Sequence, residues 1–227
     1  MTIGNDKTAD KLSIILASII KKQKSSAELE EERERILKEI EKYLSNEKPL
    51  SRDVLLNYAD ILSMIAEWER SEKKLTKHVE TSLLAMLVYS LLNDAKKDEL
   101  YQKITKRLQE LEKEALTWKN WDRAFLYRVL SILAEIISRN AKPQLTVTYL
   151  SKVYPTIRDF PSTIIEGLFC EKTSKDVENK FNTYKEFANK NNLDNIFKII
   201  VRMYGLTKLY LRMKGAISDS NDENAEC

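Results

Sequence analysis

Glycine and proline are scarce in this sequence, with four residues of each among 227. Turns between strands consume glycine, so the shortage favours helices over sheets. A loop that binds nucleotide phosphates also needs glycine, because its backbone must approach the phosphate closely. The glycines are too widely spaced for a dinucleotide-binding or Walker-type loop: Gly4, Gly167, Gly205 and Gly215. We therefore expect no nucleotide site of this kind and no bound cofactor.

Histidine and cysteine are also rare: the chain contains His78, Cys170 and Cys227 and no others. These three residues do not provide the full ligand set of a structural zinc site. A nucleophilic pair of Cys170 and His78 would need a further group to orient the base. We interpret Cys170 as a buried structural thiol and His78 as a solvated residue near a helix start. The sequence therefore predicts no catalytic and no metal-binding residues, and a protein that is not an enzyme.

Long hydrophobic runs are absent as well. The longest apolar stretches, such as 14–20 and 83–92, contain polar residues and are shorter than the ~20 residues that cross a bilayer. The N-terminus has no basic segment ahead of its apolar run, unlike a secretory signal, and the two cysteines fit a reducing compartment. We expect a soluble, cytoplasmic protein. The abundance of Lys, Glu, Ile and Leu favours a thermophilic source, although the many Asn residues argue against one.

Apolar residues recur at intervals of three and four along most of the chain, which predicts amphipathic helices. Ser25 with Glu28 has the pattern of a capping box, and Ser51 that of an N-cap. The predicted helices have these approximate limits: 12–20, 25–43, 51–70, 77–93, 98–117, 121–139, 173–189 and 193–213. Val147 and Thr148 have strand character, but no second strand signal pairs with them. We predict an all-α fold, either a helical bundle or an irregular stack of helical hairpins, with about 8–10 helices and no significant sheet.

The domain organisation follows from composition. We expect a single all-helical domain over residues 1–215, because apolar periodicity continues across it. Three of the four prolines lie in the segment 140–161, which makes that segment the best internal sub-boundary. Residues 216–227 are small, polar and acidic, and we expect a disordered tail there.

The predicted helices differ in how much of their circumference is apolar. The wide apolar arc of 121–139 indicates a central, buried helix. Helix 98–117 has only a narrow seam, formed by Tyr101, Ile104, Leu108, Leu111, Ala115 and Trp118. Such a seam is typical of an outer helix that packs on its own chain, and it also fits a partner helix. Helix 25–43 is similarly narrow, with Arg33 interrupting its seam, and we interpret its many carboxylates as a solvated face.

Positive charge is concentrated in the second half of the chain. The net charge is zero over residues 1–50, −1 over 51–118, +8 over 119–215 and −4 over 216–227. In helix 193–213, no acidic residue follows Asp194, and four cations lie opposite the apolar arc: Lys198, Arg202, Lys208 and Arg212. The helix dipole accounts for cations near the C-terminus of a helix. It does not account for Lys198 and Arg202, so these four residues are the candidate basic surface.

These observations favour a non-enzymatic helical interaction protein, an adaptor or a subunit of a larger assembly, with a protein partner or a second copy of itself. The alternative is an accessory protein that contacts the phosphate backbone of DNA or RNA through its basic C-terminal half. An acidic patch on a partner would also suit the basic surface, whereas we do not expect a membrane partner. A hidden acid–base site without a linear motif is the third possibility.

Overall fold

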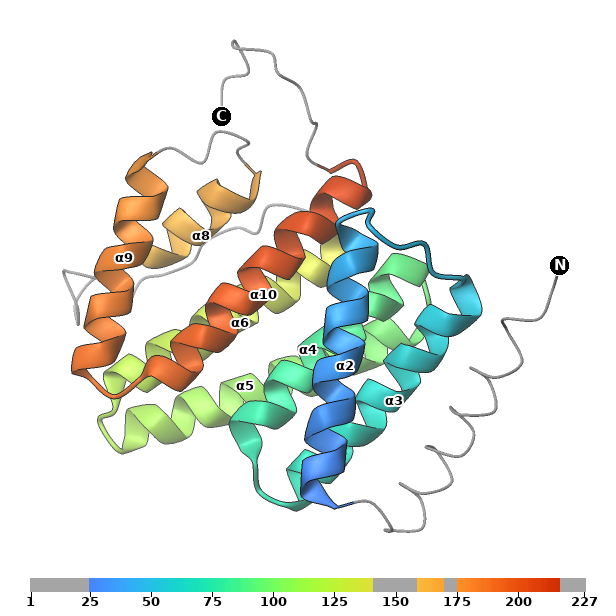
Figure 1. Cartoon of the computed structure of the whole chain (residues 1–227). Coiled ribbons are helices and arrows are strands. Elements are labelled where there is room, and N and C mark those ends of the chain that lie inside the picture. Colours follow the sequence, from blue (N-terminus) through green and yellow to red (C-terminus); the bar gives the residue numbers. More distant parts are fainter. Residues whose placement is uncertain (1–24, 141–158, 170–174, 217–227) are drawn as a thin grey trace, which may run out of the picture. The chain divides into compact units, whose positions relative to one another are not determined.

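The computed structural model describes residues 25–140, 159–169 and 175–216 (Figure 1). These ranges contain eight helices and no strand, which confirms the predicted all-α fold. The chain divides into two compact units, unit 1 over Met1–Ala95 and unit 2 over Lys96–Cys227. Each unit has its own helical packing.

The described part of unit 1 contains three helices, α2 (Ser26–Leu44), α3 (Arg52–Ser71) and α4 (Leu75–Leu92). A short turn joins α3 to α4, and these two helices pack as a hairpin, with α2 packed on α3. The stretch of α4 from Leu83 to Tyr89 is apolar at every position and buried throughout. A helix that is apolar all round belongs in the interior, so α4 is the core element of this unit.

Local signals determine where the helices of unit 1 begin. The Ser25 side chain accepts a hydrogen bond from the backbone N–H of Glu28, and the Glu28 carboxylate accepts one from the backbone N–H of Ser25. This reciprocal pair confirms the predicted capping box. Ser51 caps α3 in the same way by accepting from the backbone N–H of Val54, at 3.3 Å.

The helix ends explain how the chain manages with so little glycine. At most helix C-termini a left-handed residue closes the last turn, a position that usually holds glycine. Gly215 fills it after α10, but the other described left-handed positions hold asparagine or lysine: Asn46, Lys73, Asn93, Lys119, Asn140 and Asn192. Asparagine tolerates this conformation because its short polar side chain can hydrogen-bond locally, but lysine has no such compensation. Lys73 and Lys119 therefore carry backbone strain.

Replacing Lys73 with glycine is expected to stabilise the protein by about 0.5–1 kcal/mol. Relief of the left-handed strain is worth about 1–2 kcal/mol, and the greater freedom of glycine in the unfolded chain offsets part of it. Chemical denaturation of the full chain measures the change. Asn46→Gly is the matched control, and its gain should be smaller. Equal or lower stability of Lys73→Gly would contradict the strain at this turn.

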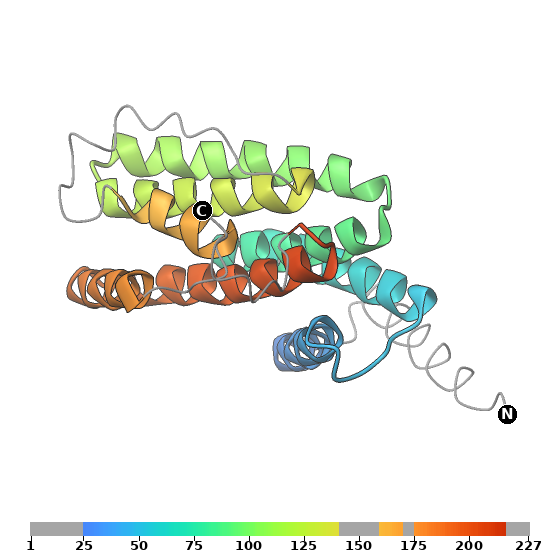
Figure 2. The same cartoon turned by 90° about the horizontal axis from the view of Figure 1, so that it is seen from above.

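Unit 2 contains α5 (Lys96–Thr117), α6 (Trp121–Arg139), α8 (Phe160–Phe169), α9 (Lys175–Lys190) and α10 (Asp194–Met213). The hairpin α5–α6 forms one side, and α6 lies between α5 and α10 (Figure 2). The shorter helices α8 and α9 pack on each other and on α10. The wide apolar arc predicted for residues 121–139 is buried along its length, which confirms α6 as a central helix.

One aromatic side chain joins four helices of unit 2. Phe160 of α8 is buried, and its ring centroid lies 4.2 Å from that of Tyr184 on α9. The centroids of Phe125 on α6 and Phe197 on α10 lie 6.1 and 6.0 Å away, and that of Phe181 on α9 lies 5.6 Å away. Aromatic pairs at such distances add to the free energy of simple burial. Phe160 is therefore the packing centre of this part of unit 2.

Two results differ from the expectations drawn from the sequence. The helix α8 was not predicted, because Pro161 and Gly167 both disfavour a helix. The division after Ala95 was not predicted either, since α5 begins directly at Lys96 and no proline or glycine marks the join. The single domain 1–215 stays a prediction. Four predicted features lie outside the described residues: the helix 12–20, the strand-like pair at 147 and 148, most of the sub-boundary 140–161 and the tail from 217.

Candidate functional site

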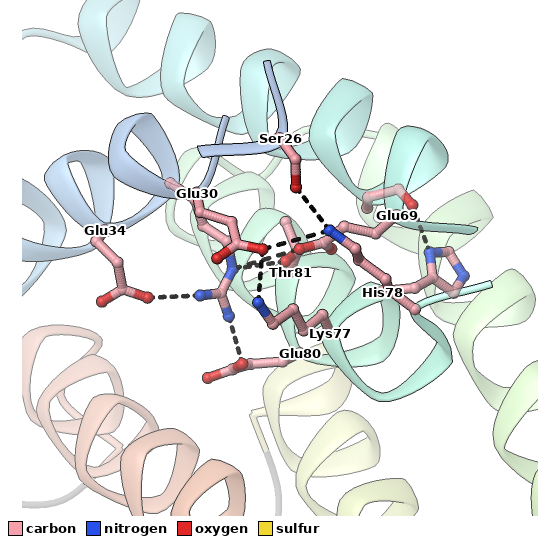
Figure 3. Close-up of polar contacts among 11 residues, drawn as sticks. Ser26, Glu30, Glu34, Glu69, Lys77, His78, Glu80 and Thr81 are labelled. Atoms are coloured by element: carbon pink, nitrogen blue, oxygen red, sulfur yellow. Dashed lines mark hydrogen bonds and ion pairs between the residues drawn. The ribbon is translucent and has the colours of Figure 1, made fainter. Parts of the chain in front are cut away.

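Unit 1 encloses a cluster of charged side chains contributed by all three of its helices (Figure 3). At its centre is Arg33 of α2, whose side chain is 6% exposed. The Arg33 guanidinium donates from Nε to Thr81 Oγ1 of α4 at 2.7 Å and forms an ion pair with Glu80 of α4. It also donates to Glu34, at 2.5 Å. These contacts attach α2 to α4 by the strong, charge-assisted kind of hydrogen bond.

The least solvated member of the cluster is Glu69 of α3, which is wholly buried. Its Oε1 lies 3.9 Å from Arg33 Nε, and within the described ranges neither carboxylate oxygen accepts a hydrogen bond of normal geometry. Burial raises the pKa of Glu69, while the nearby Thr81 hydroxyl and the charge of Arg33 oppose that rise, and the negative charge of Glu80 adds to it. The neutral form of Glu69 is thus favoured inside the fold.

Further polar contacts surround the cluster at the edge of α2. Lys77 of α4 donates to Glu30 of α2 at 2.7 Å, and Lys74 donates to the Ser26 hydroxyl at 2.8 Å. His78 places Nδ1 2.8 Å from the carbonyl oxygen of Ala66. Because Arg33, Glu69 and Glu80 are closed off from solvent, a substrate has no access to them, and the arrangement acts as a clamp that holds α2 on the α3–α4 hairpin.

Two sequence interpretations are corrected by this geometry. His78 is not solvated, since it is 8% exposed and hydrogen-bonded to the end of α3. The charge run of α2 is not a wholly solvated face, because Glu32 and Arg33 are buried. Both errors have the same cause: a helical pattern shows which face is polar but not whether a neighbouring helix covers it.

The stability of unit 1 should depend on pH through Glu69. Since its pKa is raised above the ordinary 4.5, the favourable contribution of its neutral form is lost as the pH rises from 4.5 through the raised value. The uncharged variant Glu69→Gln should therefore gain stability relative to the wild type as the pH increases. Denaturant titrations at several pH values measure the difference. A wild-type and variant pair with parallel pH profiles would contradict a raised pKa of Glu69.

The predicted partner seam of α5 is covered in the folded chain. Ile104, Leu108 and Leu111 are buried and Tyr101 is half-buried. The helix packs along α6, and an ion pair between Glu112 and Arg128 at 4.0 Å joins the two. A partner helix would reach this seam only if α5 separated from α6.

The predicted basic surface lies on α10. Lys198 and Arg212 are exposed, whereas Arg202 and Lys208 are half-buried and each makes further contacts. The apolar residues opposite them are buried against the rest of unit 2. The four cations are therefore placed toward the outer side of α10, as the helical pattern predicted. Val201 is exposed among them, so the surface is not uniformly charged.

Trp118, the last residue of the predicted seam, is exposed although the seam before it is covered, and the exposure of Trp121 was not predicted. Trp118 is 77% exposed and Trp121 is 37% exposed, on the turn between α5 and α6. The backbone of this turn is firmly held: Lys119 N–H donates to the Leu116 carbonyl at 3.0 Å, and Asn120 N–H to that of Ala115 at 2.8 Å. One sequence signal could have indicated this exposure: the two tryptophans lie on either side of a Lys-Asn pair, which is suited to the end of a helix.

Charged residues of both signs lie near the two tryptophans, with three cations and two acids, Glu114 and Asp122, among residues 113–123. Lys113, Lys119 and Arg123 are exposed, while Glu114 is the one exposed acid among the described side chains of 113–123. None of these three cations forms an ion pair within the described part of the chain. Cations without a fixed partner near exposed aromatic rings are available to an external ligand.

Comparisons with protein-family models, curated proteins and solved structures found no match to this chain. Over the described ranges, no group of three or more His, Cys, Asp or Glu side chains is placed to hold a metal ion. None of the helices there combines the length and the apolar character that crossing a bilayer requires. The surfaces of the two units are therefore the features from which a function can be inferred.

Proposed function

We propose that this protein is a non-enzymatic helical interaction protein, an adaptor or a subunit of a larger assembly. One observation supports it above the others: the α5–α6 turn exposes 77% of Trp118 on a well-ordered backbone. Leaving a large apolar side chain in water forgoes about 1.5–3 kcal/mol of burial energy. Tryptophan is also enriched among the residues that dominate binding at interfaces. We therefore propose that the partner binds at the α5–α6 turn.

The test is capture of a stoichiometric partner by the tagged full chain in its native host. Trp118→Ala and Trp121→Ala should each lose that partner. Trp118 is largely exposed, so its replacement should lower stability by no more than about 0.5 kcal/mol. Trp121 is 37% exposed, so its replacement should cost more, because the rest of its surface is covered by the chain. The matched control is Trp68→Phe in unit 1, where the indole is half-buried beneath Lys74. Retention of the same partner by both alanine variants would remove this surface from consideration.

A second candidate function is nucleic-acid binding through α10, and a specific observation favours it. Lys198 and Arg212 are exposed, and no acid follows Asp194 in that helix. Cations along one side of a helix suit contacts with a phosphate backbone, which do not depend on sequence.

Charge reversal tests this second candidate. The pair Lys198→Glu and Arg212→Glu should weaken the binding of labelled duplex DNA and lower the salt slope by about 0.9 for each phosphate that is no longer neutralised. Lys38→Glu on α2, another exposed lysine, is the control. Equal affinities in all variants would contradict a role for the basic surface.

Composition supports two smaller parts of the proposal, a cytoplasmic location and a thermophilic source. If the source is thermophilic, we expect a hyperstable protein with a melting temperature above about 90 °C. Domains from mesophilic organisms melt at about 45–65 °C. Thermal unfolding of the full chain followed by circular dichroism distinguishes the two. Fluorescence microscopy of the tagged chain in its host tests the location.

A further inference from the structure

We propose that the partner of the α5–α6 turn is single-stranded nucleic acid, whose bases stack on Trp118 and Trp121. This inference rests on the proposed function, because both assign the partner to the same turn. It goes further by naming the chemistry of the partner and the role of each side chain. Three features of unit 2 support it: the exposed indoles, the surrounding cations and the fixed backbone.

The indoles provide the surface for stacking. Trp118 directly follows the end of α5 and Trp121 is the first residue of α6, so the two tryptophans flank Lys119 and Asn120. Every base has an aromatic face, and stacking on a protein aromatic ring is worth about 1–3 kcal/mol per base. A base can stack in this way only when it is free of its own duplex, which favours a single strand.

The charges near the indoles are complementary to a phosphate backbone. Lys113 lies one turn before the end of α5, Lys119 is in the turn and Arg123 is in the first turn of α6. All three are exposed. A strand whose bases contact the two tryptophans would bring its phosphates close to these cations. Alternating aromatic and basic side chains are the usual composition of a surface that binds single strands without sequence preference.

The backbone holds these side chains in place before any ligand arrives. Besides the two hydrogen bonds that close the end of α5, the Asn120 side chain accepts from the N–H of Arg123 at 3.2 Å and caps α6. In both views the α9–α10 turn lies at the same end of unit 2 as the α5–α6 turn (Figure 1 and Figure 2). The exposed Lys190 precedes that second turn, and Lys198 follows one helical turn into α10. A bound strand therefore has further cations within the same end of the unit.

The charge around the turn distinguishes this partner from others. A protein pocket for two indoles would be apolar, and the rim of a protein interface commonly mixes charges of both signs. Here Lys113, Lys119 and Arg123 outnumber the acids of the same stretch, Glu114 and Asp122, and none of the three forms an ion pair within the described part of the chain. An anionic lipid surface shares the attraction for cations and tryptophan, so vesicles form one arm of the test.

The experiment uses the full chain and measures two signals: its intrinsic tryptophan fluorescence, and the fluorescence anisotropy that reports binding of a ligand. The ligands are oligothymidylate and oligouridylate of about 16 nucleotides, a duplex of equal length, and vesicles of phosphatidylcholine with phosphatidylserine. We expect fluorescence quenching and saturable binding with one or both single strands, and weaker binding with the duplex. The two strands separate DNA from RNA as the source of the same chemistry.

Variants assign the binding to the turn. Trp118→Ala should weaken the affinity for the single strand about 5- to 160-fold, which is the range expected for one stacked base. Trp118→Phe should recover much of it, because the ring is retained. Lys119→Glu should weaken binding and reduce the dependence on salt. Trp68→Phe should leave the affinity and its dependence on salt unchanged, since Trp68 is in unit 1.

The results separate this inference from the proposed function. Absence of single-strand binding at low salt, or equal affinity of Trp118→Ala and wild type, overturns the inference. A captured protein that depends on Trp118, without single-strand binding, overturns the inference and leaves the proposed function standing. Vesicle binding that shifts the fluorescence to the blue, with no response to either strand, also overturns it. If the Trp118→Ala variant still binds every ligand and partner, both this inference and the proposed function fail.

Discussion

Replacing Arg33 with methionine is expected to lower the free energy of unfolding by about 3–5 kcal/mol, the usual cost of removing one partner from a buried ion pair. Without the guanidinium, the buried Glu80 loses the cation with which it forms an ion pair, and Glu69 loses its nearest positive charge. Thr81 also loses the donor that binds its hydroxyl. Chemical denaturation followed by circular dichroism measures the loss.

Arg35→Met is the matched control, because it makes the same substitution two residues further along α2. Arg35 pairs with Glu32 at 2.6 Å, but its side chain is 46% exposed. An exposed pair contributes about 0–1 kcal/mol. Replacing the whole cluster at once, as in Arg33→Met with Glu69→Gln and Glu80→Gln, should recover part of the loss, since no charge is then left buried. Similar small losses for Arg33→Met and Arg35→Met would disprove the clamp.

Replacing Phe160 with alanine is expected to cost about 3–5 kcal/mol, the range for deleting a buried aromatic side chain. The ring contacts aromatic residues of α6, α9 and α10, so its removal leaves a cavity at the junction of four helices. The surrounding rings belong to different helices and cannot all move inward together, which keeps the cavity open. Equilibrium denaturation measures the change, and hydrogen exchange shows which helices lose protection.

Phe160→Leu serves as the control for packing, since it keeps most of the apolar volume at the same position. Its cost should be clearly smaller, at about 1–2 kcal/mol. An exposed apolar residue of unit 2, Val201, gives a baseline, and Val201→Ala should change stability by less than about 0.5 kcal/mol. If Phe160→Ala were no more harmful than Val201→Ala, Phe160 would not be the packing centre.

The same two variants test the predicted single domain. Arg33 lies in unit 1 and Phe160 in unit 2. In a single cooperative domain, each substitution shifts one common transition, as seen by probes in both units. If the units unfold independently, Arg33→Met destabilises the helices of unit 1 alone and Phe160→Ala destabilises those of unit 2 alone. Hydrogen exchange resolved by segment distinguishes these outcomes.

Local signals were sufficient to predict where most helices lie. The capping box at Ser25 and the N-cap at Ser51 were readable because each joins residues three apart in the sequence. The helix α8 was not readable, since its stability comes from burial against α9 and α10. Its Gly167 also has a tertiary reason: a Cβ there would lie 2.2 Å from the Tyr204 hydroxyl of α10.

The candidate sites were predicted unevenly for a related reason. Lys198 and Arg212 were placed correctly on the outside of α10, because one helical pattern determines which residues share a face. Trp118 continued the spacing of the α5 seam, yet α5 ends at Thr117 and the turn carries the indole away from that seam. The cluster of Arg33, Glu69 and Glu80 had a single signal, the position of Arg33 in the apolar seam of its helix, and its partners could not be predicted because they come from two other helices.

By itself, therefore, the sequence determined the all-helical class, the caps and limits of most helices, and the basic character of the second half of the chain. These properties depend on backbone preferences and on residues three or four positions apart, which a linear pattern records. Only the tertiary structure decided that Arg33 and Glu69 are buried and that Trp118 is exposed. Burial depends on which helices pack together, and that is set by the combined apolar surfaces of residues far apart in the chain.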